Sequence, residues 1–366
     1  MDTQTAGSAG MQITGSLSMR EAVRACVGDP RADIASYRVE SMAFQALATD
    51  SLDRVSGETT DGTPWSMVVK RLRSMRHWPD VHLVPEAVRD RTIERFPWRA
   101  EADLYLDPPA LPEGLRLPRV YLVEDLGDDR LALWLEDVRE VADCWDLGRY
   151  RRAARLLGEL AASRPGDGLD EGLHAYLDGP VTGVFIPTLR DPGFWRHPLV
   201  AAVADPLLQC DLLALADRVA EFVAVVEELP RFRGHGDASP SNLLVPADGS
   251  AEFVAIDWSW PYPTALGFDL GQLLCGRAHA GVLDPADLPV VHEAILAAYA
   301  EAFPGLAVQD VWTGYVASLV LRSAWTALPF EMLGQEDTPA LRELFAKRAG
   351  LARFIVDLGR SLSTRG

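Results

Sequence analysis

Strand-like patterning gives way to helix-like patterning about a third of the way along this 366-residue chain, and this change constrains the fold more than any other feature. Short strand-like runs lie before residue 138, at 36–41, 53–58, 65–72, 119–124 and 130–134. A helical stretch at about 85–105 separates the third run from the fourth, and from about residue 146 the pattern is mostly helical. We therefore expect an α+β chain with two lobes.

Local signals refine this division. The Asp-Gly pair in Thr59–Gly62 predicts a tight hairpin between the second and third strands, and Pro97 suits the first turn of a second helix. We expect residues 1–35 to form an N-terminal extension, 36–138 a β-rich N-lobe, and 139–366 a mainly helical C-lobe.

The helical part contains one amphipathic stripe and one interruption. Apolar residues spaced three and four apart predict one helix that ends at Pro230, with the stripe Leu212, Leu215, Val219, Phe222, Val226 and Leu229 facing the core. A short β-hairpin, 242–245 and 252–256, interrupts the helices.

Composition excludes several classes of protein. With 35 Lys plus Arg against 53 Asp plus Glu, the formal net charge is -18, which repels phosphate backbones and excludes nucleic acid as a partner. No apolar run approaches the roughly 20 residues that span a bilayer, and Met1–Gly15 lack a secretory pattern. The four cysteines are scattered without a Cys-x-x-Cys pair, so neither a zinc site nor a disulfide framework is indicated. We expect a cytoplasmic protein without a membrane segment.

Polar residues suited to chemistry gather at the ends of the predicted hairpin. Asp237 and Asn242 lie in the stretch His-Gly-Asp-Ala-Ser-Pro-Ser-Asn that enters it, and Asp257 follows its returning strand. A hairpin brings its ends together, so these side chains are expected to converge. Asn242 and Asp257 offer the hard oxygen ligands that Mg²⁺ prefers, and Asp237 would accept a hydrogen bond from a substrate hydroxyl.

A second interpretation of the same residues is a metallohydrolase that uses His235, Asp237 and Asp257 as metal ligands. This alternative leaves Lys70 and Asn242 without a role.

The motif His-Gly-Asp-x-x-x-x-Asn, followed by a strand and Ile256-Asp257-Trp258, resembles the aminoglycoside phosphotransferase and related kinase-like small-molecule phosphotransferase family. Trp258 stands where that family usually has Phe, and Gly267–Leu270 resembles its Gly-x-Asp-Leu. The resemblance implies a two-lobed protein-kinase-like fold. It also implies transfer of phosphate from ATP or GTP, with Mg²⁺ as cofactor, to a small-molecule hydroxyl, and a bracing role for Asp269.

The same resemblance assigns nucleotide-binding residues upstream. Lys70 would hold the α- and β-phosphates, and Val68, two residues earlier on the strand, would lie against adenine. Glu101 is the expected partner of Lys70, with Glu94 as its competitor. The backbone at Glu136 and Val138 would bind the base.

One departure from the family concerns the phosphate-covering loop, because Ser41–Asp50 contains no glycine. This keeps open a non-catalytic nucleotide-binding protein. The acceptor also stays open: family members act on aminoglycosides and other antibiotics, and on amino alcohols or sugars. The helical segment 146–230 and the C-terminal helices are expected to build the acceptor site.

Overall fold

The computed structural model describes residues 17–43, 47–84, 86–142 and 144–363. These divide into two compact units. Unit 1 contains the described residues up to Leu106 together with Pro118–Asp137, and unit 2 contains Asp107–Leu117 and the described residues from Val138 onward. Residues 1–16, on which the expectation about a secretory signal depends, lie outside the described part.

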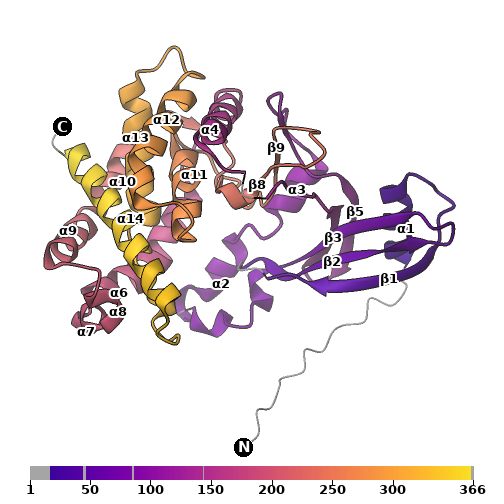
Figure 1. Cartoon of the computed structure of the whole chain (residues 1–366), viewed down its shortest axis with the longest axis horizontal. Helices are drawn as coiled ribbons and strands as arrows, with labels where there is room; N and C mark the ends of the chain where they lie inside the picture. Colours follow the sequence, from indigo (N-terminus) through magenta and orange to yellow (C-terminus); the bar gives the residue numbers. More distant parts are fainter. Residues whose placement is uncertain (1–16, 44–46, 85, 143, 364–366) are drawn as a thin grey trace, which may run out of the picture. The chain divides into compact units, whose positions relative to one another are not determined.

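Unit 1 is built on an antiparallel sheet with strand order β1-β2-β3-β6-β5 (Figure 1). Its α-helices and strands in the described residues are α1 (Leu17–Val27), β1 (Ile34–Ser41), β2 (Thr49–Thr59), β3 (Pro64–Arg73), α2 (Glu86–Arg95), α3 (Ala100–Leu106), β5 (Val120–Gly127) and β6 (Arg130–Glu136). Every strand-like run predicted before residue 138 coincides with one of these strands. The predicted α+β class is thereby confirmed.

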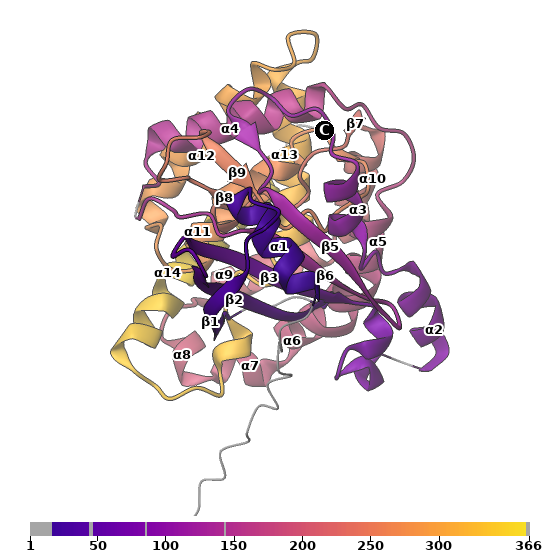
Figure 2. The same ribbon diagram turned by 90° about the vertical axis from the view of Figure 1, so that its right-hand side faces the viewer.

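Strand β3 has one core face and one open face. Trp65, Met67 and Val69 point into the core, whereas the alternating residues Val68 and Lys70 are only half-buried. Helix α1 covers the core face (Figure 2) and buries Met19, Ala22 and Val23, which are spaced as neighbours on one helical face. The segment treated as an extension in the sequence analysis therefore contributes part of the core of unit 1.

The boundary of unit 1 differs from the expected one at a second place. Residues 107–117 belong to unit 2, because the two-residue strand β4 (Leu115–Arg116) pairs in parallel with β9 (Phe253–Ala255). A strand of this length has no periodicity that the sequence could reveal.

The helical stretch at 85–105 is confirmed as two helices, but Pro97 is not in the first turn of the second. Helix α3 begins at Ala100, whose N–H donates to the Pro97 carbonyl oxygen at 3.0 Å. Pro97 therefore begins the turn before α3. In the loop Ser41–Asp50, β1 ends at Ser41 and β2 begins at Thr49, and residues 44–46 lie outside the described part.

Unit 2 is mainly helical. Besides β4, its described elements are α4 (Leu147–Ala162), α5 (Glu171–Tyr176), a π-helical segment η3 (Leu177–Phe185), α6 (Ile186–Arg190), α7 (Pro192–Arg196), α8 (Pro198–Ala201), α9 (Pro206–Ala216), α10 (Val219–Glu228), β7 (Arg231–Phe232), β8 (Leu243–Leu244), β9, β10 (Thr264–Ala265), α11 (Phe268–His279), α12 (Leu288–Ala300), α13 (Val308–Ser323) and α14 (Pro339–Ser363). Helix α13 is the most buried of the longer ones and packs against α10, α11, α12 and α14 (Figure 1).

The apolar stripe at 212–229 is divided between two helices rather than lying on one. Arg218 N–H donates to the Leu215 carbonyl oxygen, three residues back, and this turn separates α9 from α10. Leu212 and Leu215 on α9 and Phe222 and Val226 on α10 are nevertheless buried. The spacing predicted the buried face correctly but did not predict the break.

The predicted β-hairpin is present. Strands β8 and β9 pair antiparallel, and β4 completes a sheet of order β4-β9-β8 among the described residues. The two β9 residues that pair with β8 are Val254 and Ala255. Both are fully buried, so the hairpin is anchored in the core of unit 2.

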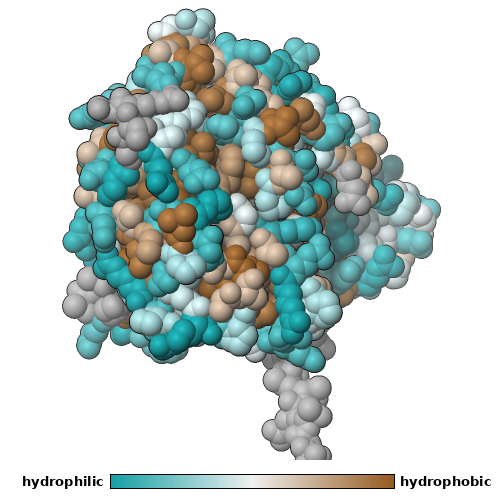
Figure 3. Space-filling model, turned by 60° about the vertical axis from the view of Figure 1, so that its left-hand side comes forward, coloured by the Kyte–Doolittle hydropathy of each residue, from teal (hydrophilic) through white to brown (hydrophobic). Residues whose placement is uncertain are grey.

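A helix that crosses a membrane must be both long and apolar. Across the described residues, the helices are too short or too polar to cross a bilayer. On the face shown in Figure 3, hydrophobic side chains form patches separated by hydrophilic ones.

Candidate active site

The loop that carries Asp237 is held by a buried carboxylate. Asp269 is 2% exposed and lies in the first turn of α11, and its two oxygens accept the backbone N–H groups of His235 (2.9 Å) and Gly236 (2.7 Å). Gly236 has φ +85°, and a Cβ there would lie 2.2 Å from Trp260 Cβ, so the position requires glycine. The expected bracing role of Asp269 is confirmed.

His235 is a scaffold of this loop. Its ring is fully buried; Nε2 donates to the Ile256 carbonyl oxygen at 3.0 Å, and Nδ1 accepts the Asp237 N–H at 3.3 Å. The ring also packs against Trp258, with centroids 4.3 Å apart. Because both ring nitrogens are engaged, His235 cannot serve as the metal ligand that the metallohydrolase interpretation needs.

Asn242 bonds Asp237 through its side chain and the segment before Asp257 through its backbone. Its Nδ2 donates to the Asp237 carbonyl oxygen at 2.9 Å and to Asp237 Oδ2 at 3.1 Å. Its carbonyl oxygen accepts the Ile256 N–H at 3.0 Å, which places Asp257, the next residue, beside it. Asp257 has φ +61°, a left-handed backbone that a loop holds only under tertiary constraint. Asp237 and Asn242 are thus in direct contact, and Asp257 lies in the adjoining segment, where its charge acts on the Asp237 carboxyl.

The electrostatics of Asp237 reflect this crowding. Burial raises the pKa of its carboxyl above the usual value, the nearby Arg322 guanidinium lowers that pKa, and the charge of Asp257 raises it again. The side chain keeps 33% of its surface exposed, so it remains accessible to a substrate.

Arg322, which lies on α13, is a residue of this group that was not predicted from the sequence. Its Nη1 donates to the Gly236 carbonyl oxygen at 2.6 Å, and its Nη2 lies 3.7 Å from Asp237 Oδ1. A signal was present, because Arg322 is the only charged residue between Val311 and Phe330. A lone charge in an apolar helix needs a partner from elsewhere in the fold.

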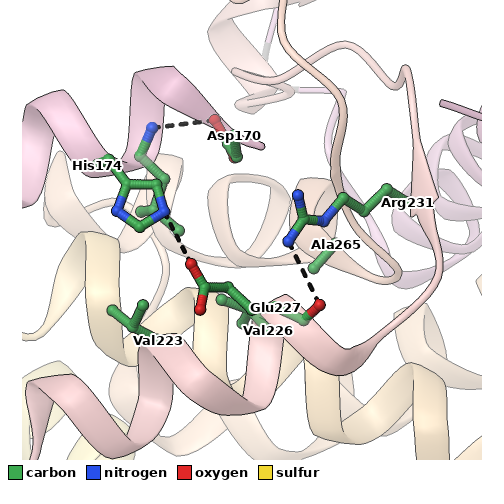
Figure 4. A pocket seen from close by; sticks show the side chains of 8 residues that line it. Asp170, His174, Val223, Val226, Glu227, Arg231 and Ala265 are labelled. Atoms are coloured by element: carbon green, nitrogen blue, oxygen red, sulfur yellow. Dashed lines mark hydrogen bonds and ion pairs between the residues drawn. The ribbon is translucent and has the colours of Figure 1, made fainter. Parts of the chain in front are cut away.

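A small pocket, shown in Figure 4, is lined by Asp170, another acid that was not predicted from the sequence. Asp170 is 7% exposed, caps α5 by accepting the Leu173 N–H at 2.9 Å, and accepts the Trp260 indole N–H at 3.2 Å. Burial raises the pKa of its carboxyl to about 6. The same pocket is lined by His174 and Glu227, whose Nε2 and Oε1 atoms lie 3.0 Å apart.

Unit 1 contains Lys70 and Glu101, the charged pair predicted to contact the nucleotide. Lys70 Nζ on β3 lies 2.6 Å from Glu101 Oε2 on α3, and the two side chains are 12% and 5% exposed. Glu101 also accepts the Tyr105 hydroxyl at 3.1 Å. Glu94, the competing partner, is exposed on α2. The chain has two lysines, Lys70 and Lys347, in a total of 35 basic residues, so lysine at this strand position stands out in an arginine-rich chain.

The remaining nucleotide-binding candidates lie on or after neighbouring strands. Val68 pairs in register with Leu135 on β6. The Glu136 N–H donates to the Arg119 carbonyl oxygen at 2.8 Å, so a contribution of Glu136 to base binding would come from its carbonyl oxygen. The chain passes from unit 1 to unit 2 between Asp137 and Val138.

Asp137, the residue after β6, is an acid with most of its side chain buried. Its carboxylate accepts the Ser66 hydroxyl at 2.6 Å and pairs with Arg54 Nε at 3.0 Å, and only 12% of the side chain is exposed. These contacts hold the end of β6 against β2 and β3 within unit 1.

The donor set at the hairpin fits Mg²⁺. Because Nδ2 of Asn242 is engaged by Asp237, Oδ1 is the atom of that amide that can face a metal ion, with the Asp257 carboxylate as the second ligand. Mg²⁺ takes few protein ligands and completes its shell with phosphate oxygens and water. Among the described residues, no three His, Cys, Asp or Glu side chains form a metal-binding group by themselves.

Comparisons with known proteins give structural likeness without a sequence match. No protein-family model and no curated protein matches the chain. An amicoumacin kinase in complex with AMP-PNP, Ca²⁺ and Ami matches with a TM-score of 0.48 and 13% identity, over 87% of this chain and 88% of its own. A thermostable mutant of an aminoglycoside phosphotransferase matches with a TM-score of 0.45 and 12% identity, over 95% and 99%. An ethanolamine kinase from Plasmodium vivax matches with a TM-score of 0.43 and 13% identity, over 84% and 80%.

These solved structures are of the kind that the motifs of the chain resemble, namely kinases of small molecules. Because their TM-scores lie below 0.5, they assign no residue role and no substrate to this chain.

Proposed function

We propose that this chain is a Mg²⁺-dependent phosphotransferase that moves the γ-phosphate of ATP or GTP to a hydroxyl group of a small molecule. The observation that carries the proposal is the group formed by Asp237, Asn242 and Asp257: the Asn242 side chain bonds Asp237, and its backbone carbonyl oxygen bonds Ile256, the residue before Asp257. Phosphoryl transfer asks a protein for positioning and charge neutralisation rather than for covalent chemistry. The accessible Asp237 carboxylate would supply the positioning, and Asn242 and Asp257 would supply the charge neutralisation by holding Mg²⁺.

In unit 2, Asp237 would accept the hydrogen bond of the acceptor hydroxyl and orient its oxygen toward the γ-phosphorus. As the new P–O bond forms and the bond to the nucleoside diphosphate breaks, the hydroxyl proton passes to the Asp237 carboxylate. Asn242 and Asp257 would hold Mg²⁺, which neutralises charge on the phosphates when bound.

In unit 1, Lys70 would contact the α- and β-phosphates, and Glu101 would hold the Lys70 ammonium in place. Val68 lies on the same face of β3 and would pack against the base. The Glu136 carbonyl oxygen, and at the start of unit 2 the Val138 backbone, would bind the polar edge of the base.

The test is release of ADP or GDP in the presence of Mg²⁺, each nucleotide and a panel of acceptors. The panel contains aminoglycosides, nucleoside antibiotics, macrolides, amino alcohols and sugars. Release that depends on one acceptor class supports the proposal and identifies the substrate. Nucleotide binding without release across the panel favours a non-catalytic nucleotide-binding protein. Absence of nucleotide binding contradicts the proposal.

The scarcity of lysine gives a second test that needs no acceptor. An ATP derivative with a lysine-reactive acyl phosphate should label Lys70, and an excess of ATP should prevent the labelling. Lys347, whose ammonium donates to the Gly281 carbonyl oxygen at 3.0 Å and pairs with Glu343, is the internal control. Equal labelling of both lysines, with or without ATP, would contradict a phosphate-binding role for Lys70.

A further inference from the structure

Arg322 connects parts of unit 2 that are far apart in the sequence. It lies near the end of α13, and its guanidinium reaches the loop before the hairpin, where it contacts Gly236 and Asp237. The side chain is 13% exposed, which is low for arginine. A guanidinium that is largely removed from water needs acceptors for its N–H groups and packing partners for its two flat faces.

Two aromatic rings supply the partners for its faces. The Arg322 Cζ lies 4.7 Å from the ring centroid of Trp260 and 5.0 Å from that of Phe268. Trp260 follows Asp257 by three residues, and Phe268 precedes the clamping Asp269. The guanidinium therefore touches each of the segments that carry the candidate catalytic group, and stacking restricts its plane.

The surroundings of Arg322 are themselves held in place. The Arg322 carbonyl oxygen accepts the Tyr176 hydroxyl at 2.9 Å, which fixes the end of α13 to α5. The indole N–H of Trp260 donates to the buried Asp170 carboxylate. Both contacts reduce the freedom of the guanidinium to move away from Asp237.

A second buried arginine shows what a purely structural role looks like in this unit. Arg348, 6% exposed, donates to the backbone carbonyl oxygens of Ala327, His279 and Thr326. These bonds tie segments together and involve no candidate functional group. Arg322 differs because one edge of its guanidinium bonds the Gly236 carbonyl oxygen while another faces the Asp237 carboxylate.

We propose that Arg322 is a positioning residue that holds the Gly236–Asp237 peptide and the Asp237 carboxylate in the orientation required for phosphate transfer. Its positive charge offsets the mutual repulsion of Asp237 and Asp257. Its guanidinium attracts Oδ1 of Asp237 across 3.7 Å, while Asn242 donates a hydrogen bond to Oδ2. The inference rests on the proposed function for the role of Asp237.

The kinetic test uses Arg322→Met, Arg322→Lys and Arg353→Met with Mg-ATP and the best acceptor from the panel. Arg353, which pairs with Asp211 at 2.7 Å, controls for loss of an arginine–carboxylate pair. We expect Arg322→Met to lower kcat about 100-fold, the loss typical of a misplaced catalytic group, with KM for ATP unchanged. Arg322→Lys should recover part of this loss, and Arg353→Met should retain full kcat. Unchanged kcat in both Arg322 variants would overturn the proposal.

Crystal structures of the two Arg322 variants provide a readout that does not depend on activity. In Arg322→Met, the 3.1 Å bond between Asn242 Nδ2 and Asp237 Oδ2 should be lost through rotation of the carboxylate, whereas Arg322→Lys should retain it. An Asp237 carboxylate that keeps its position in Arg322→Met would overturn the proposal, even if kcat falls. If the wild-type protein transfers phosphate to nothing, the proposed function fails, and the crystal structures still decide whether Arg322 positions Asp237. If Arg322→Met does not fold, kcat of Arg322→Lys decides: a fall of about tenfold at constant KM for ATP supports the proposal, and no fall overturns it.

Discussion

The two units hold their candidate functional residues by different means. In unit 1, Lys70 lies within β3 and Glu101 in the first turn of α3, and one ion pair joins two regular elements. In unit 2, Asp237 and Asp257 lie on loops in which Gly236 and Asp257 have left-handed backbone, and Asn242 ends a three-residue 3-10 helix, Pro240–Asn242. There the backbone is held by buried side chains, Asp269 and His235, through bonds to main-chain groups.

The difference shows what each kind of backbone needs. On a strand, the pleat already directs alternate side chains to one face, so a single contact completes the orientation. On a loop, no repeating hydrogen-bond pattern directs the side chains, and each backbone group must find its own partner. The loop can then aim several groups at one point, at the cost of a dedicated set of buried polar residues.

The largest effect should come from the residue that the loop presents. Asp237→Ala should lower phosphate transfer by about 10² to 10⁴-fold, because it removes the carboxylate that orients and deprotonates the acceptor. Binding of Mg-nucleotide, measured by calorimetry, should stay within about threefold, a factor that is small on the free-energy scale. Asp248→Ala, in the exposed turn of the same hairpin, is the matched control. Full activity in Asp237→Ala would contradict the assignment of the acceptor-orienting carboxylate to the loop of unit 2.

The bonds from Asp269 to the loop of unit 2 should matter more for stability than the Lys70–Glu101 ion pair of unit 1. Asp269→Ala leaves the N–H groups of His235 and Gly236 buried without their charged acceptor, and should lower the free energy of unfolding by about 3–5 kcal/mol. Urea denaturation measures the change. Asp310→Ala, at a half-buried acid in the first turn of α13, should cost far less. Similar losses of stability in the two variants would mean that the loop does not depend on the bonds from Asp269.

A pH-dependent stability change should mark the polar support of the loop in unit 2. The pKa of Asp170 is raised to about 6 by burial, so the folded state favours its protonated form and stability falls as pH rises from about 4 through 6. Asp170→Asn mimics the protonated form and keeps an acceptor for Leu173 and Trp260. We expect it to be more stable than the wild type by about 1–3 kcal/mol at pH 8, and equal to it below pH 4. A constant difference across this range in denaturation curves would contradict the raised pKa.

The smallest effect should come from the strand contact in unit 1. Glu101→Ala leaves Lys70 on β3 but removes its partner, and should weaken Mg-ATP binding about tenfold, or about 1.4 kcal/mol. Glu94→Ala, at an exposed position on α2, should have no measurable effect in the same calorimetric titration. Equal weakening by both variants would show that the ion pair does not position Lys70 for nucleotide.

Prediction from the sequence succeeded where a local pattern carries the information. The strands of unit 1 and the hairpin of unit 2 lie where the sequence has strand-like runs. The approach of Asp237, Asn242 and Asp257 could be inferred, because the ends of a hairpin must meet. The prediction of one continuous helix at 212–229 was wrong, because the spacing of apolar residues persists across the turn at Arg218.

The strands of unit 1, the hairpin of unit 2 and the identity of the acids around that hairpin were determined by the sequence alone, since each depends on residues close together in the chain. Only the tertiary structure decided that α1 belongs to the core of unit 1 and that Arg322 lies against Asp237. Arg322 and Asp237 are 85 residues apart, and their contact depends on how α13 packs against α11 and α10. No local periodicity encodes such packing, because many distant side chains determine it together.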